Sequence, residues 1–154
     1  MVQFALACSP SEKPEPPRVP SITRGDIDGF WFGTYKTRQS ARPDPVTDED
    51  LLARLVDAMN KSSVDTWSVV PSVADGLDIS LWLKDGRRAD VWVYAEYPID
   101  HARILRWDDS AGVYVQYAVY APELVGLAKE IARQRLTPME KILVAPPDGN
   151  WLEE

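Results

Sequence analysis

The segment LDISLWLKDGRRADVWVYAEY, residues 77–97, decides the fold, because its alternating pattern predicts a two-stranded antiparallel hairpin at the centre of a sheet. A two-residue loop would place Leu81 opposite Asp90 and mix the two faces of the hairpin. A three-residue loop, Lys84 to Gly86, with the glycine in the left-handed region, keeps the faces separate. This register predicts six cross-strand pairs: Leu77–Val93, Asp78–Trp92, Ile79–Val91, Ser80–Asp90, Leu81–Ala89 and Trp82–Arg88.

One face of this hairpin is aliphatic, and the other is polar and aromatic. Since Trp, Tyr and Arg are enriched at binding hot spots, we interpret the second face as a platform for a protein, peptide or glycan partner. The alternative is that the N-terminal segment, or a C-terminal tail with Trp151, folds over it as a second small core. The candidate binding residues are Trp82, Arg88, Trp92 and Tyr94, with Trp107, Tyr114 or Tyr117 as possible extensions.

The flanking sequence supplies further strands and two amphipathic helices. Thr47 is the expected N-cap of the first helix, and Pro122 suits the first turn of the second. Thr137 and Glu140 have the spacing of a capping box. We predict an α+β domain, with an antiparallel sheet of about five to six strands and both helices packed on its aliphatic face. The expected strands are 25–36, a short one within 64–73, the central hairpin, 102–107 and 113–119; the expected helices are 47–61 and 122–132.

Composition excludes several classes of protein. The chain has 154 residues and a net charge of -7, which argues against a nucleic-acid binder and against electrostatic attachment to anionic lipid. Its single cysteine rules out an intramolecular disulfide, and its single histidine leaves little for a zinc site. We therefore predict no metal, no cofactor and no nucleic-acid partner, and expect a monomer or weak dimer.

The residues that catalysis requires are not spaced for it. His101 lies next to Asp100 at the entry to a strand, with no nucleophile or second ligand in reach by sequence, and Cys8 lies far from any core segment. We interpret His101 as a surface or structural residue. The sequence therefore predicts a protein that is not an enzyme.

The N-terminus has a pattern of its own. Small apolar residues run from Ala5 to Cys8, and five of the twelve residues from Ser9 to Pro20 are proline. This pattern resembles the end of a bacterial lipoprotein signal, in which the cysteine becomes the lipidated first residue. It departs from that signal in lacking a leucine at Ala5, a basic start and a full apolar region. The alternative is an unstructured tail with an incidental cysteine.

Overall, the chain resembles the small, uncharacterised lipoproteins of bacteria that carry one α+β domain on a proline-rich tether. That resemblance implies a tether at 1–24, a domain at 25–145 and a tail at 146–154. It also implies a non-enzymatic binding or accessory domain at the cell envelope, attached to the membrane only through lipid on Cys8. The alternative function is a cytoplasmic acidic interaction protein, such as an immunity protein or enzyme inhibitor.

Overall fold

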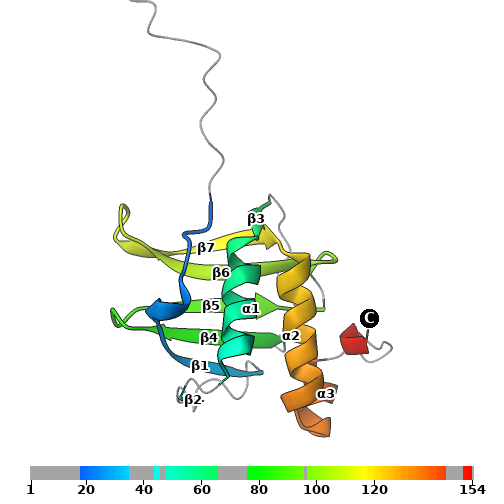
Figure 1. Ribbon diagram of the computed structural model, residues 1–154. Coiled ribbons are helices and arrows are strands. Elements are labelled where there is room, and N and C mark those ends of the chain that lie inside the picture. The colour runs from blue at the N-terminus through cyan, green and yellow to red at the C-terminus, as the bar shows by residue number, and fades with distance from the viewer. Residues whose placement is uncertain are drawn as a thin grey trace, which may run out of the picture.

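The computed structural model describes residues 18–34, 44–45, 48–65, 76–95, 97–144 and 151–153. Its centre is one antiparallel sheet of seven strands in the order β2-β1-β4-β5-β6-β7-β3 (Figure 1). Together with two main helices, this confirms the predicted α+β class. The strands are β1 (Ile27–Thr34), β2 (Asp44–Pro45), β3 (Ser63–Val64), β4 (Leu77–Leu83), β5 (Arg88–Val93), β6 (His101–Asp108) and β7 (Val113–Tyr120).

The central hairpin, β4 and β5, has the predicted register. All six expected cross-strand pairs are present, from Leu77 opposite Val93 to Trp82 opposite Arg88. Two backbone bonds close the turn: the amide of Gly86 donates to the carbonyl of Leu83, and the amide of Leu83 donates to that of Arg87. Gly86 has φ +85°, the left-handed conformation that the three-residue loop requires.

The helices α1 (Glu49–Asn60) and α2 (Pro122–Arg135) lie side by side on one face of the sheet (Figure 1). Their apolar stripes pack against the aliphatic face of the hairpin to form the main core. The predicted N-cap of α1 was wrong by one residue: the carboxylate of Asp48 accepts the amide of Leu51 and caps the helix. Thr47 lies outside the described residues.

The predicted signals for the later helices are confirmed. Pro122 occupies the first turn of α2. The capping box precedes α3 (Pro138–Val144): the Glu140 amide donates to Thr137 Oγ1, and the Thr137 amide donates to Glu140 Oε1, both at 3.2 Å. Pro138 follows the cap directly, so both signals at this helix start are local in the sequence.

Both ends of the described chain contribute to the core. Ile22 is buried and exchanges two hydrogen bonds with the side chain of Asn60 on α1, so this segment lies on the helix-covered side. It leads into a short 3-10 turn, η2 (Arg24–Asp26). At the other end, Leu152 is buried in η4 (Trp151–Glu153), and Arg133 of α2 donates to its carbonyl. The core thus includes residues beyond both predicted domain boundaries.

Some predictions concern residues that the structure does not describe. These are Cys8 with most of the proline-rich segment, the end of the first predicted strand at 35–36, and the part of the 64–73 strand that follows Asp65. Within the described ranges, none of the helices has the length and apolar character needed to cross a membrane.

Candidate functional site

The candidate site lies on the sheet face opposite α1 and α2, which we call the aromatic–arginine face. Its centre is formed by half-buried side chains from the hairpin, Trp82, Arg88 and Trp92, which alternate with the aliphatic core residues. Trp31 of β1 stands opposite Ser80 and so belongs to the same face. Strand pairing therefore brings together three of the four predicted site residues and adds Trp31.

Small polar side chains beneath these rings are buried. Asp78, Ser80 and Asp90 are only 1–2% exposed. The hydroxyl of Ser80 donates to Asp90 Oδ1 at 2.6 Å, and Arg88 Nε donates to Asp90 Oδ2 at 3.0 Å. Asp90 therefore holds the Arg88 guanidinium, whose side chain remains 43% exposed, in a fixed position on the face.

A second aromatic cluster extends the face across β6 and β7. Trp107 and Tyr114, both predicted extensions, meet edge to face with ring centroids 5.2 Å apart. The Arg87 guanidinium lies 4.3 Å from the centre of the Trp107 ring and is bound by Asp109 at 2.6 Å. The Tyr114 hydroxyl accepts a bond from the amide of Arg88, which joins this cluster to the hairpin.

Two sequence predictions for this face were wrong. Tyr117 stands opposite Ile104, a core residue, and so lies on the helix-covered side, where burial raises its pKa. Trp151 packs against α2, with the Lys129 amine 5.0 Å from its ring centre. The described N-terminal segment also runs on the helix side, since Arg106, next to Ile104 on that side, donates to the carbonyl of Pro20. The parts of both termini that the structure describes therefore do not cover the aromatic–arginine face.

Tyr94, the fourth predicted residue, lies just beyond the end of β5. Its ring rests directly on Gly76, where an added Cβ would come within 2.3 Å of the ring. It also meets the ring of Tyr97 edge to face at 5.0 Å. The guanidinium of Arg103 in turn lies 5.5 Å from the Tyr97 ring centre. Tyr94 therefore ends the row of aromatic and arginine side chains at one end of the sheet.

A cavity of about 340 Å³ opens beside Tyr94, between the β5–β6 connection and α2. Its lining includes aromatic and basic side chains: Tyr94, Tyr97, Trp151, Lys129 and His101. This volume is at the lower end of the range for small-molecule sites. The cavity joins one end of the aromatic–arginine face to the C-terminal turn.

His101 has a clear structural role in this region. Its Nδ1 lies 2.7 Å from the carbonyl of Ile99, and its Nε2 lies 2.8 Å from the carboxylate of Asp65. Both ring nitrogens are thus engaged within the protein, and the contact with Asp65 joins the residue after β3 to the start of β6. In this arrangement the ring presents no nitrogen to a substrate.

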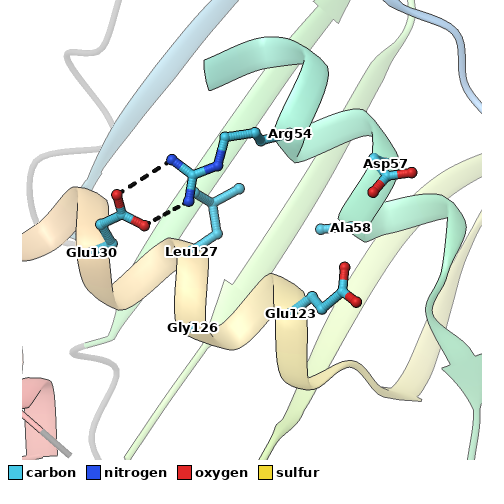
Figure 2. A pocket seen from close by; sticks show the side chains of 7 residues that line it. All are labelled: Arg54, Asp57, Ala58, Glu123, Gly126, Leu127 and Glu130. Carbon is cyan, nitrogen blue, oxygen red and sulfur yellow. Dashed lines mark hydrogen bonds and ion pairs between the residues drawn. The ribbon is translucent and has the colours of Figure 1, made fainter. Parts of the chain in front are cut away.

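A separate cleft of about 340 Å³ lies between α1 and α2, on the helix-covered side of the sheet (Figure 2). Its floor includes Ala58, Gly126 and Leu127. At one end Arg54 donates from both terminal guanidinium nitrogens to Glu130, at 2.7 and 3.3 Å, and this hydrogen bonding lowers the pKa of Glu130. At the other end Lys61 contacts two carboxylates, Asp57 at 3.0 Å and Glu123 at 3.4 Å. Three carboxylates and one guanidinium therefore line this cleft, and each carboxylate has a basic partner, Arg54 or Lys61.

Among the described residues, no group of three or more His, Cys, Asp and Glu side chains is arranged to hold a metal ion. Hydrogen bonds within the acidic turn after β6 stabilise it instead. Asp108 Oδ1 accepts bonds from the Ser110 amide and hydroxyl, and these bonds lower the pKa of Asp108. Comparison of the chain with models of protein families, with curated proteins and with solved structures found no match.

Sequence reasoning missed Trp31, Tyr97 and Arg103 as members of the face. The pairing of β1 with β4 places Trp31 there, and that pairing joins segments almost fifty residues apart. Alternation within β1 could not assign a face, because Phe30, Trp31 and Phe32 are consecutive aromatic residues. Arg103 could have been found from its alternation with Ala102 and Ile104.

Proposed function

We propose that this protein is a non-enzymatic binding domain that captures a protein, peptide or glycan partner on its aromatic–arginine face. The observation that carries this proposal is the half-buried group of Trp82, Arg88 and Trp92, which stands beside the buried polar side chains of Ser80 and Asp90. Large aromatic side chains and arginine supply much of the energy at binding hot spots. The main helices and the described N-terminal segment lie on the opposite side of the sheet.

The face has the rigidity that favours binding. Its central members stand on paired strands, Arg88 is fixed by Asp90, and Trp107 is held between Arg87 and Tyr114. Side chains that are already ordered lose little rotamer freedom when a partner binds. Arg87, Arg88 and Arg103 supply donors for partner carboxylates or carbonyls.

The test compares the wild-type chain with a Trp82→Ala, Trp92→Ala double variant, each tagged and expressed in its native cell. Partners are recovered by affinity purification and identified by mass spectrometry. The matched control is Val113→Ala, which truncates an exposed apolar side chain of β7. The proposal expects a partner recovered with the wild type and the control but lost with the double variant. Equal recovery from all three would contradict it.

We also propose that the domain is held at the cell envelope through lipid on Cys8. The support is the lipobox-like run from Ala5 to Cys8 and the proline-rich stretch that follows it. The test is intact mass spectrometry with membrane fractionation, on protein expressed from the native locus with its upstream sequence. A membrane-bound chain that begins at Cys8 with the mass of diacylglyceryl supports the proposal. A soluble, unmodified chain contradicts it.

The net charge of -7 supports a second candidate function, a cytoplasmic immunity or inhibitor protein. Its candidate surface is the cleft between α1 and α2, where three carboxylates, Asp57, Glu123 and Glu130, stand with Arg54. Such a surface suits a basic partner, for which electrostatic attraction raises the association rate. This candidate expects the partner to contact the helices instead of the sheet, which a crosslinking experiment distinguishes.

A further inference from the structure

We propose that His101 carries a proton on both ring nitrogens and serves as a pH-sensitive latch, which ties the end of β3 to the turn that leads into β6. This turn comprises residues 98–101 and forms one wall of the cavity beside Tyr94. The latch does not depend on the capture of a partner by the aromatic–arginine face. Its basis is the two hydrogen bonds of the ring, the backbone of the turn and the groups that surround both.

The partners of the imidazole determine its protonation. Nδ1 lies 2.7 Å from the carbonyl of Ile99, and Nε2 lies 2.8 Å from the carboxylate of Asp65. A carbonyl and an ionised carboxylate can only accept hydrogen bonds, whereas a neutral imidazole has one donor and one acceptor nitrogen. A neutral ring would therefore set a lone pair against one of these oxygens. The imidazolium donates from both nitrogens and satisfies both contacts.

The orientation of the ring follows from the same contacts. Turning the ring over would place a ring carbon, instead of a nitrogen, near each of the two oxygens. Contacts between a C–H group and an oxygen are normally about 3.3–3.6 Å long, which is too long for the space available here. The ring therefore fits with its nitrogens toward Ile99 and Asp65. Its side chain is only 14% exposed, so water has limited access to replace either bond.

The turn that the latch holds has an unusual backbone conformation. Asp100 has φ +62°, and it is the only residue other than glycine with a positive φ in the part of the chain that the structure describes. This left-handed conformation is less favourable for aspartate than for glycine, so the turn depends on the contacts around it. The His101 amide donates to the carbonyl of Pro98 at 3.0 Å, and the Ala121 amide donates to that of Asp100 at 2.8 Å. The bond from Nδ1 to Ile99 is a third contact within the same turn.

The imidazole is the group of this region whose charge changes near neutral pH. Charged and titratable side chains surround the ring or line the same cavity: Asp65 after β3, Asp100 in the turn, Tyr120 on β7, Tyr97 before the turn and Lys129 on α2. The two carboxylates favour the charged form of the ring, and the amine opposes it. Carboxylates, phenols and amines ordinarily titrate outside the range of about pH 5 to 8, in which imidazole titrates.

Loss of one proton should open the latch. The neutral ring can keep one of its two bonds, and its other nitrogen then faces an acceptor oxygen. Because the folded protein favours the charged ring, the latch stabilises the domain at low pH, and this contribution falls as pH rises and the ring loses its proton. The cavity wall that residues 98–101 form should therefore loosen at higher pH.

NMR tests the latch in the wild-type chain, in which His101 is the only histidine and its ring signals are unambiguous. The measurement follows the ring nitrogen shifts and the protection factors of backbone amides from about pH 5 to about pH 9. We expect the protection of the Asp65 and Ala121 amides, which bond next to the latch, to fall as the ring loses its proton. The Gly112 amide, bonded to the Asp108 carbonyl in another turn, should keep its protection. Equal behaviour of all three amides would overturn the proposal.

Two substitutions provide a variant and its control. Asp65→Asn removes the charge of the acceptor and keeps the shape of the side chain. In this variant the ring should lose its proton at lower pH, and the melting temperature should fall more at about pH 5.5 than at about pH 8.5. Asp57→Asn removes the carboxylate of an exposed ion pair with Lys61, so its effect should be the same at both pH values. A His101 titration that Asp65→Asn does not alter, or a pH-independent loss in that variant, would overturn the proposal.

Discussion

The hydroxyl of Ser80 donates a 2.6 Å hydrogen bond to the carboxylate of Asp90, directly across the central hairpin. Both side chains are almost fully buried, although they alternate with the core residues and so lie on the sheet face opposite the main helices. Because the same carboxylate also accepts from Arg88, this pair links the interior of the sheet to the surface where we propose that a partner binds. The buried Ser80–Asp90 pair beneath the aromatic–arginine face is thus part of the folded interior.

Removal of the Ser80 hydroxyl should destabilise the domain. Ser80→Ala leaves one oxygen of a buried carboxylate without this donor, which typically costs about 1–3 kcal/mol of unfolding free energy. The matched control is Ser110→Ala, because the Ser110 hydroxyl donates to Asp108 at 2.7 Å in an exposed turn. The control should change stability by less than about 0.5 kcal/mol. Urea denaturation measures both, and equal losses would show that burial of the pair has no energetic role.

Substitution of two glycines should change the free energy of unfolding in opposite directions. Gly86→Val places a β-branched residue at φ +85° and should reduce the unfolding free energy by at least about 1–2 kcal/mol. Gly126 lies inside α2 with open space around an added Cβ, so Gly126→Ala should raise it by about 1 kcal/mol. Thermal denaturation compares both with the wild type. An unchanged melting temperature for Gly86→Val would contradict the turn conformation.

The tryptophans of the aromatic–arginine face should be more important for binding than for folding. Trp82 and Trp92 are half-buried, so each alanine variant should lose less than the about 3–5 kcal/mol expected for a fully buried tryptophan. Leu81→Ala, at a fully buried neighbouring position, should cost about 2–5 kcal/mol and provides the reference. If the tryptophan variants unfold as readily as Leu81→Ala, these rings belong to a second core.

The Arg54–Glu130 ion pair should give stability that depends on pH. The pKa of Glu130 is lowered from its ordinary value of 4.5, so the pair stabilises the protein above that pH and less as pH falls through the lower, folded-state pKa. Glu130→Gln should therefore slightly lower the melting temperature at pH 7, and this effect should shrink as pH falls through the folded-state pKa of Glu130. In an Arg54→Met background the substitution should have almost no effect at any pH. An equal effect with and without Arg54 would show that the pair does not stabilise the domain.

Local sequence signals predicted the hairpin register, the left-handed glycine and the capping box because each depends on a few neighbouring residues. The face itself could be predicted only in part. Alternation identified Trp82, Arg88 and Trp92, but Trp31 depends on the pairing of β1 with β4, which no short-range pattern encodes. Tyr117 was assigned to the wrong face because every residue of β7 is apolar or uncharged, which leaves little alternation to follow.

Site-specific photo-crosslinking in the native cell tests the central claim most directly. A benzophenone amino acid replaces Trp82 in one variant, on the aromatic–arginine face, and Gly126 in another, in the open cleft between α1 and α2. We predict a discrete crosslinked partner from position 82 and none from position 126. A partner that crosslinks from position 126 and not from position 82 would contradict our account and would favour the surface of α1 and α2 as the binding site.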